Sequence, residues 1–158
     1  MVGTFGKAFG AGGAFVAGCP ALVAWLWNRA RSFVFSTGLS PAVAAAALQG
    51  LHLARSEPDR RRRVLAAATL LREGMVRLGA APVGFGHILP WVLGEAGQAL
   101  RVAAALRGRG LDVRAIRPPS VPRGTARIRL TVTAAHRSAD IERALVDLAA
   151  VLAPGIGP

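Results

Sequence analysis

Residues 3–13 read Gly-Thr-Phe-Gly-Lys-Ala-Phe-Gly-Ala-Gly-Gly, and the choice of fold depends on this stretch more than on any other. Its lysine, Lys7, is the only lysine in a chain with 20 Lys and Arg side chains. An arginine stays protonated and does not condense with a carbonyl group, whereas a deprotonated lysine amine can form a Schiff base. Lys7 is therefore the first candidate for covalent chemistry.

A nucleotide-binding interpretation of this glycine-rich segment fails on spacing. A Walker loop has a glycine five positions before the glycine of its Gly-Lys pair, and Ser or Thr after the lysine. This chain has Met1 and Ala8 at those two positions. It also lacks the His-x-x-x-His, Cys-x-x-Cys and Gly-x-Ser-x-Gly patterns of zinc sites and serine hydrolases, so the sequence predicts no metal site.

The composition favours a globular protein that does not bind nucleic acid. With 158 residues, of which 53% are hydrophobic, the chain is long enough to bury a core. Its net charge of +12 comes from arginines scattered through an alanine- and glycine-rich sequence. The six Phe and three Trp residues do not alternate with these arginines, so no base-stacking platform is visible. A basic nucleic-acid binder stays open only as a minor alternative.

The N-terminal region imitates a membrane anchor. Residues 8–28 carry no charge, and Val16-Ala17-Gly18-Cys19 resembles the cleavage site of a bacterial lipoprotein. The glycines of this region would weaken an apolar helix, and the sequence after Cys19 stays apolar instead of opening into a polar tether. A single cysteine excludes an internal disulfide and suits a reducing compartment, where Cys19 is expected as a small buried side chain. We therefore predict a cytoplasmic protein without a membrane segment.

The first third of the chain alternates between short strands and helices. We expect a buried strand at 13–18, a helix at 20–30 that begins with a proline, and a strand at 32–37 rich in Phe and Val. A second helix should begin at Pro41, with Ser40 as its cap. This helix is apolar on nearly every face at 43–53, so it needs cover on several sides.

The remainder predicts a long helix followed by a small α+β region. The helix begins at 60–63 with four arginines, which we interpret as a solvated face, and its apolar residues recur every three or four positions. Residues 79–86 form a linker. The pattern beyond it is strand 87–93, helix 95–107, strand 111–117, strand 127–133 and helix 138–152, with Ser138 as a cap.

Strand 127–133 places two arginines on one face. Ile128, Leu130 and Val132 alternate with Arg127, Arg129, Thr131 and Thr133. One of the arginines could hold a carboxylate in a bidentate fork. From the spacing alone, a solvated sheet face is an equally good interpretation.

Three motifs, taken in order, resemble one enzyme family. They are the segment 4–13 around Lys7, residues 33–41 (Phe-Val-Phe-Ser-Thr-Gly-Leu-Ser-Pro), and residues 115–130 (Ala-Ile-Arg-Pro-Pro-Ser-Val-Pro-Arg-Gly-Thr-Ala-Arg-Ile-Arg-Leu) followed by Ala-Ala-His at 134–136. They are similar to the α-oxoamine synthases, which are class II pyridoxal-phosphate (PLP) enzymes, and to the C-terminal portion of these enzymes only. The resemblance covers essentially all 158 residues.

The resemblance implies a fold and a domain division. The fold would be α/β, the C-terminal part of a fold-type I (aspartate aminotransferase-like) PLP-dependent transferase. Residues 1–55 would be the remnant of the large PLP-binding domain, 56–80 a linking helix, and 81–158 the small C-terminal α+β domain.

The resemblance also implies cofactor-binding residues. Lys7 would bind PLP as a Schiff base and then act as the acid/base group at the substrate Cα. Thr4 would contact the cofactor phosphate, and Ser36 or Thr37 would reach the phosphate in the neighbouring subunit of a homodimer.

Three further residues would bind substrate according to the same resemblance. Arg129 would hold the amino acid carboxylate, with Arg127 as a substitute. Ser120 stands where the family usually has a substrate-contacting threonine, and this departure leaves a hydroxyl group in place.

Within the family, the segment Arg117-Pro118-Pro119 favours one activity. This is the condensation of L-alanine with a pimeloyl thioester of coenzyme A or acyl carrier protein, with decarboxylation to 8-amino-7-oxononanoate, a step of biotin biosynthesis. Synthases of the glycine C-acetyltransferase, 5-aminolevulinate synthase and serine palmitoyltransferase types are the alternatives.

Part of the implied active site is missing from the sequence. The chain begins shortly before the lysine motif, and the family's aspartate at the pyridinium nitrogen, ring-stacking histidine and phosphate-binding helix start have no counterpart. We therefore expect a fragment that is inactive alone, with aggregation-prone apolar faces. The alternative is a noncatalytic half that pairs with a separate N-terminal half.

Overall fold

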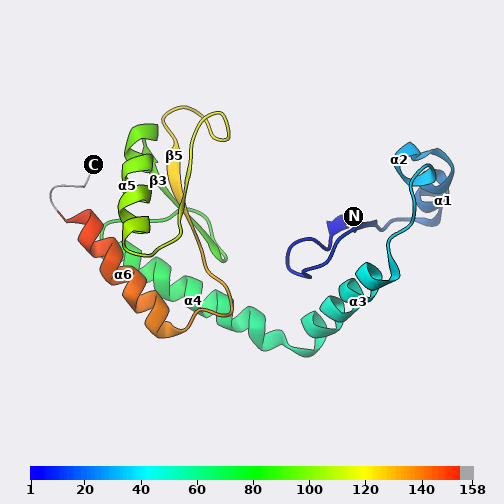
Figure 1. Ribbon diagram of the computed structural model, residues 1–158, viewed down its shortest axis with the longest axis horizontal. Helices are drawn as coiled ribbons and strands as arrows, with labels where there is room; N and C mark the ends of the chain where they lie inside the picture. The colour runs from blue at the N-terminus through cyan, green and yellow to red at the C-terminus, as the bar shows by residue number, and fades with distance from the viewer. Residues whose placement is uncertain (154–158) are drawn as a thin grey trace. The chain divides into compact units, whose positions relative to one another are not determined.

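The computed structural model describes residues 1–153, whose contacts group into two compact units. Unit 1 is Met1–Pro58, and unit 2 begins at Asp59. Figure 1 shows the helices and strands of both units, coloured by their position along the chain. The predicted division into 1–55, 56–80 and 81–158 stays a prediction about domains.

Unit 1 consists of a short hairpin and three helices. Its elements are β1 (Val2–Thr4), β2 (Ala14–Val16), α1 (Pro20–Arg29), α2 (Arg31–Val34) and α3 (Pro41–Ser56). The two strands are antiparallel, with Val2 opposite Val16 and Thr4 opposite Ala14. Residues 5–13 form the hairpin loop, so the motif around Lys7 leaves β1 and returns through β2. The helices predicted at 20–30 and from Pro41 are confirmed.

The hairpin loop contacts α3 at a glycine. A Cβ atom on Gly50 would lie 2.7 Å from the backbone oxygen of Phe9, so only glycine permits this approach. Ala11 of the loop and Ala47 of α3 are buried in the same unit. Small side chains therefore let the loop lie directly on the helix.

The strand predicted at 32–37 and the buried position predicted for Cys19 are both wrong. Residues Arg31–Val34 form α2, in which the Val34 amide donates to the Ala30 carbonyl at 2.9 Å. A strand needs a neighbour to complete its hydrogen bonds, whereas a helical turn satisfies them locally. No strand of unit 1, all of which the structure describes, pairs with this segment. Cys19 is exposed, because it lies at the start of α1 in a unit that buries few side chains.

Unit 2 is a three-stranded antiparallel sheet covered by helices. Its elements are α4 (Pro58–Arg77), β3 (Ile88–Gly94), α5 (Ala96–Gly108), β4 (Arg114–Ile116), β5 (Ala126–Thr131) and α6 (Ser138–Leu152). The strand order is β3-β5-β4. Helix α5 contacts all three strands and α6. Figure 1 shows α5 beside β3 and β5. The predicted order of strands and helices is confirmed, although β4 is shorter than residues 111–117.

The core of unit 2 forms between the sheet and its helices. Its largest fully buried side chains are those of Met75, Leu89, Leu106, Ile128 and Leu148. Helices α4 and α6 meet so closely that a Cβ on Gly74 would overlap the methyl groups of Leu145. This packing fixes the position of the central strand, β5. The side chains of β5 that do not enter the core lie on the opposite face of the sheet.

Candidate active site

Lys7 lies exposed in the loop between β1 and β2. Backbone hydrogen bonds shape this loop: Phe5 donates to Gly13 at 3.0 Å, Ala11 donates to Phe5 at 3.0 Å, and Gly10 donates to Lys7 at 3.1 Å. Gly10 has a φ of +62°, which glycine adopts without strain. Within residues 1–153, the Lys7 amine makes no hydrogen bond or ion pair. The loop therefore holds the Lys7 backbone and leaves its amine free.

Three phenylalanines support the lysine loop. The Phe5 ring lies 5.7 Å from the Phe9 ring and 5.4 Å from the Phe15 ring, measured between centroids. The Phe15 ring lies over Gly3, where a Cβ would come within 2.5 Å of it. Aromatic pairs at these distances contribute beyond simple burial. The hairpin is thus braced on both sides of Lys7.

The predicted phosphate-binding hydroxyls also lie in unit 1. Thr4 is the last residue of β1 and is exposed. Ser36 and Thr37 line an open pocket of about 560 Å³, whose wall includes Ala14, the cross-strand neighbour of Thr4. The Ser36 hydroxyl donates to the Phe33 carbonyl at 3.2 Å and keeps its oxygen as an acceptor. Ser36 and Thr37 thus lie beside the strand that pairs with Thr4, whereas Lys7 does not line this pocket.

The predicted alternation along β5 is confirmed. Ile128 and Leu130 are 0% and 5% exposed and face the core. Arg129 lies on the opposite face, across from Pro90 of β3 and Arg114 of β4. Its side chain is exposed, and within residues 1–153 it makes no hydrogen bond or ion pair. Arg129 can therefore offer its full guanidinium fork to a carboxylate.

Arg127 lies on the same face but in a different environment. It is half-buried, and its Nε donates to the Thr125 carbonyl at 3.0 Å. Ser120 lies exposed in the loop between β4 and β5, where its amide donates to the Arg117 carbonyl at 3.0 Å. The structure therefore separates the two arginines that the sequence alternation treats alike.

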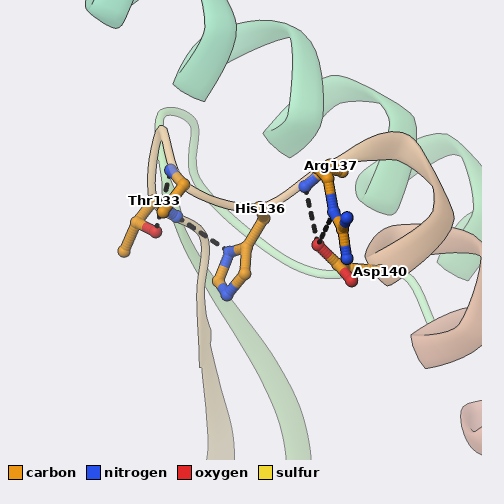
Figure 2. Close-up of polar contacts among 5 residues, drawn as sticks. Thr133, His136, Arg137 and Asp140 are labelled. Atoms are coloured by element: carbon orange, nitrogen blue, oxygen red, sulfur yellow. Dashed lines mark hydrogen bonds and ion pairs between the residues drawn. The ribbon is translucent and has the colours of Figure 1, made fainter.

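His136 closes the turn after β5, as Figure 2 shows. Its Nδ1 accepts a hydrogen bond from the Thr133 amide at 3.1 Å, and its own amide donates to the Thr133 carbonyl at 3.2 Å. The Ala135 amide donates to the Thr133 hydroxyl at 3.4 Å. Both bonds of His136 serve the turn, so the histidine of the third motif has a structural role in this unit.

The start of α6 differs from the prediction. The cap position is held by Arg137, not by Ser138, and the Arg137 amide donates to the Asp140 carboxylate at 2.8 Å (Figure 2). Asp140 reaches back over the first turn, whereas Ser138 is already inside the helix. The hydrogen bond from the Arg137 backbone, followed by that from its side chain, lowers the pKa of Asp140 below its ordinary value of 3.8.

The predicted site residues form two sets, one in each unit. Lys7, Thr4, Ser36 and Thr37 belong to unit 1, and Ser120, Arg127 and Arg129 belong to unit 2. Thr125, whose carbonyl accepts the hydrogen bond from Arg127, was not among the predicted site residues. The Pro-Arg-Gly-Thr segment at 122–125 could have predicted a tight turn ending at this residue, because proline and glycine favour turns.

No helix within residues 1–153 has both the length and the apolar character needed to cross a membrane. In the same residues, His, Cys, Asp and Glu side chains do not gather in threes that could hold a metal ion.

Known proteins match this chain along most of its length. The model of the family "Aminotransferase class I and II" matches residues 1–148. An 8-amino-7-oxononanoate synthase from Anaeromyxobacter dehalogenans is 52% identical over 99% of this chain. The match covers 40% of that relative, so the chain spans about two-fifths of the length of such proteins.

Solved structures share the same architecture. A high-resolution structure of serine palmitoyltransferase (SPT) with PLP has a TM-score of 0.88 and 28% identity, and covers 96% of this chain and 39% of that one. The 8-amino-7-oxononanoate synthase from Francisella tularensis has a TM-score of 0.83 and 26% identity, over 96% of this chain and 44% of that one. The predicted α/β class, as part of a fold-type I enzyme, is confirmed.

Proposed function

Because this chain belongs to the aminotransferase class I and II family, we propose that it supplies the lysine-bearing portion of an 8-amino-7-oxononanoate synthase. The observation that carries the proposal is the free amine of Lys7, presented on a braced glycine-rich loop. The 52% identity to the Anaeromyxobacter relative extends over 99% of the chain and supports this activity over others in the family.

The side chains of unit 1 fit pyridoxal phosphate. A free primary amine can condense with its aldehyde, and the hydroxyl groups of Thr4 and Thr37 can donate to phosphate oxygens. The Ser36 hydroxyl would first have to release its hydrogen bond to the Phe33 carbonyl. The bound cofactor supplies an electron sink that stabilises a carbanion at the substrate Cα. The Lys7 Nζ would hold the cofactor, and it is also a base suited to take the proton from this Cα and to return it.

The side chains of unit 2 fit the amino acid substrate. We assign the L-alanine carboxylate to the unpaired guanidinium of Arg129, which can hold both oxygens at once. The exposed hydroxyl of Ser120 is assigned to the substrate as well. The second substrate is a pimeloyl thioester of coenzyme A or of a carrier protein. The new carbon–carbon bond replaces the carbon–sulfur bond and releases the thiol, and loss of the alanine carboxylate as CO2 then gives 8-amino-7-oxononanoate.

We infer that activity requires more polypeptide than residues 1–158. The match covers only 40% of the Anaeromyxobacter relative, and Glu57, at the end of α3, is the only acidic residue in unit 1, all of which the structure describes. We propose that the chain acts together with the remaining part of the synthase, in a cytoplasmic homodimer. The single cysteine supports a reducing compartment.

Mixing two chains tests the proposal. The part of the Anaeromyxobacter synthase that this chain does not match is expressed separately and mixed with it, PLP, L-alanine and pimeloyl-CoA. We expect 8-amino-7-oxononanoate from the mixture and none from either chain alone, measured by mass spectrometry. Borohydride should fix a pyridoxyl group on Lys7 in the mixture only.

The matched controls are Lys7→Ala and Lys7→Arg, the second of which keeps the positive charge. Both should abolish the product and the fixed pyridoxyl group, since neither has an amine that can condense. Product formed by the Lys7→Ala mixture would refute the assignment of Lys7.

A serine-using synthase is the second candidate. The observation in its favour is structural: the SPT structure has a TM-score of 0.88, above the 0.83 of the Francisella synthase. Replacing L-alanine and pimeloyl-CoA by L-serine and palmitoyl-CoA in the same mixture distinguishes the two activities. Turnover of the serine pair alone would favour the second candidate.

A further inference from the structure

Two arginines of β5 share one face of the sheet but differ in what they contact. Arg129 is exposed and makes no hydrogen bond or ion pair within residues 1–153. Arg127 is half-buried, and its Nε donates to the Thr125 carbonyl at 3.0 Å. A guanidinium already committed to a backbone carbonyl has fewer donors left for a ligand. The two side chains are therefore suited to different tasks.

The carbonyl that Arg127 contacts belongs to the loop that carries Ser120. Residues 117–125 join β4 to β5, and Thr125 ends the loop in a tight turn. The Thr125 amide and hydroxyl both donate to the Pro122 carbonyl, at 3.2 Å and 2.8 Å. Gly124, inside this turn, has a φ of +74°, a conformation that glycine adopts without strain.

A chain of contacts thus runs from the sheet into the loop. Arg127 binds Thr125, and Thr125 binds Pro122, two residues beyond Ser120. Arg127 itself is anchored in the sheet, where it lies opposite Val92 of β3 and Ile116 of β4. A hydrogen bond from a charged donor is stronger than a neutral one, so this link can restrain the loop.

We propose that Arg127 is a positioning residue that holds the 117–125 loop, and with it Ser120, at the start of β5, the strand that carries Arg129. This inference rests on the proposed function, in which Ser120 and Arg129 contact the substrate. Arg127 then acts through Thr125 and does not bind the carboxylate itself. It follows that the two arginines are not interchangeable, although strand alternation places them on the same face.

Amide hydrogen exchange of the full chain tests the link directly. The readouts are the amides of Ser120 and Thr125, which are bonded to the carbonyls of Arg117 and Pro122. Arg127→Ala should speed their exchange about tenfold, the scale set by one charge-assisted hydrogen bond. Arg127→Lys keeps one donor and should restore part of the protection.

Two variants serve as matched controls, and a third measurement monitors folding. Arg129→Ala removes the neighbouring arginine of the same face, and Arg123→Ala removes an exposed arginine of the loop itself. Both should leave the two amides unchanged. Far-ultraviolet circular dichroism shows whether each variant folds, and Arg127→Lys provides the test if Arg127→Ala does not. Unchanged exchange in whichever of these variants folds would overturn the proposal.

Titration with L-alanine of the mixture of this chain, the unmatched part of the Anaeromyxobacter synthase and PLP separates this inference from the proposed function. The Nε–Hε resonance of Arg129 should shift as the amino acid is added, whereas that of Arg127 should not. Arg127→Ala should raise the apparent Kd several-fold, and Arg127→Lys should reverse part of this change. A shift at Arg127 of the same size as that at Arg129 would overturn the positioning role. No shift at Arg129, together with the expected exchange result, would refute the substrate assignment and leave the link intact.

Discussion

The two units of this molecule differ most in how they bury apolar side chains. Ala11 and Ala47 are the only buried apolar residues of unit 1, all 58 residues of which the structure describes. Unit 2 buries Met75, Leu106, Leu148 and many others in one continuous core. Burial of a large apolar side chain stabilises a fold by about 1.5–3 kcal/mol, so unit 2 holds far more stabilisation of its own.

Unit 1 instead leaves large apolar side chains at its surface. Trp25, Trp27 and Phe35 are 60%, 64% and 80% exposed, and Leu48 of the apolar helix α3 is 57% exposed. Exposed apolar surface of this kind marks either an interface or a tendency to aggregate. The unit that carries the candidate catalytic lysine is therefore the less self-sufficient one. Its hairpin is held by local contacts, namely the phenylalanine cluster and the glycine contact with α3.

The largest expected effect is the difference in unfolding free energy between two leucine truncations, one in each unit. Leu106→Ala removes a fully buried side chain from unit 2 and should cost about 2–5 kcal/mol of unfolding free energy. Leu48→Ala, in α3, removes a mostly exposed one and should cost less than about 0.5 kcal/mol. Urea unfolding followed by the amide resonances of each unit measures both. Equal costs would show that unit 1 has a core that the burial pattern does not reveal.

A glycine of unit 1 should give the next largest effect. Gly50→Ala would gain about 1 kcal/mol of helix propensity in α3 but would place a Cβ 2.7 Å from the Phe9 oxygen. Since a backbone atom must move, we expect a net loss of about 1–3 kcal/mol and faster amide exchange in residues 5–11. Gly38→Ala is the matched control, because a Cβ there would meet no atom within 4 Å. Unchanged exchange in the loop would mean that α3 does not support it.

The sequence predicted unit 2 better than unit 1, and the reason is physical. In unit 2, alternation in β5 and helical spacing in α6 each match a face that the unit itself buries, as Ile128 and Leu148 show. In unit 1, Phe33 and Val34 are β-forming residues, yet no neighbouring strand completes their hydrogen bonds and they form the helix α2. Local propensity fails where the deciding contact lies outside the segment.

The candidate site shows the same limit. The motifs identified Lys7 and Arg129, and the structure leaves both side chains free of partners within residues 1–153. Strand alternation could not distinguish Arg127 from Arg129, because the difference depends on a carbonyl supplied by the loop before β5. The prediction that Ser138 caps α6 was wrong for a related reason. Serine is a favoured cap residue, but here the Asp140 carboxylate accepts the hydrogen bond from the Arg137 amide.

The smallest expected effect concerns the start of α6 and its dependence on pH. The Arg137 backbone and side chain lower the pKa of Asp140 in the folded chain, so folding favours the ionised carboxylate. Its contribution is therefore complete above the ordinary pKa of 3.8 and is lost as the pH falls through the lower folded value. In Asp140→Asn, amide exchange in the first turn of α6 should be faster at neutral pH and should not accelerate further as the carboxylate of the unchanged chain becomes protonated. In Glu142→Gln, the loss of protection at low pH should remain. Because Asp140 lies at the surface of unit 2, the hairpin of unit 1 should not respond; a response there would mean that the two units are coupled more tightly than their separate burial patterns indicate.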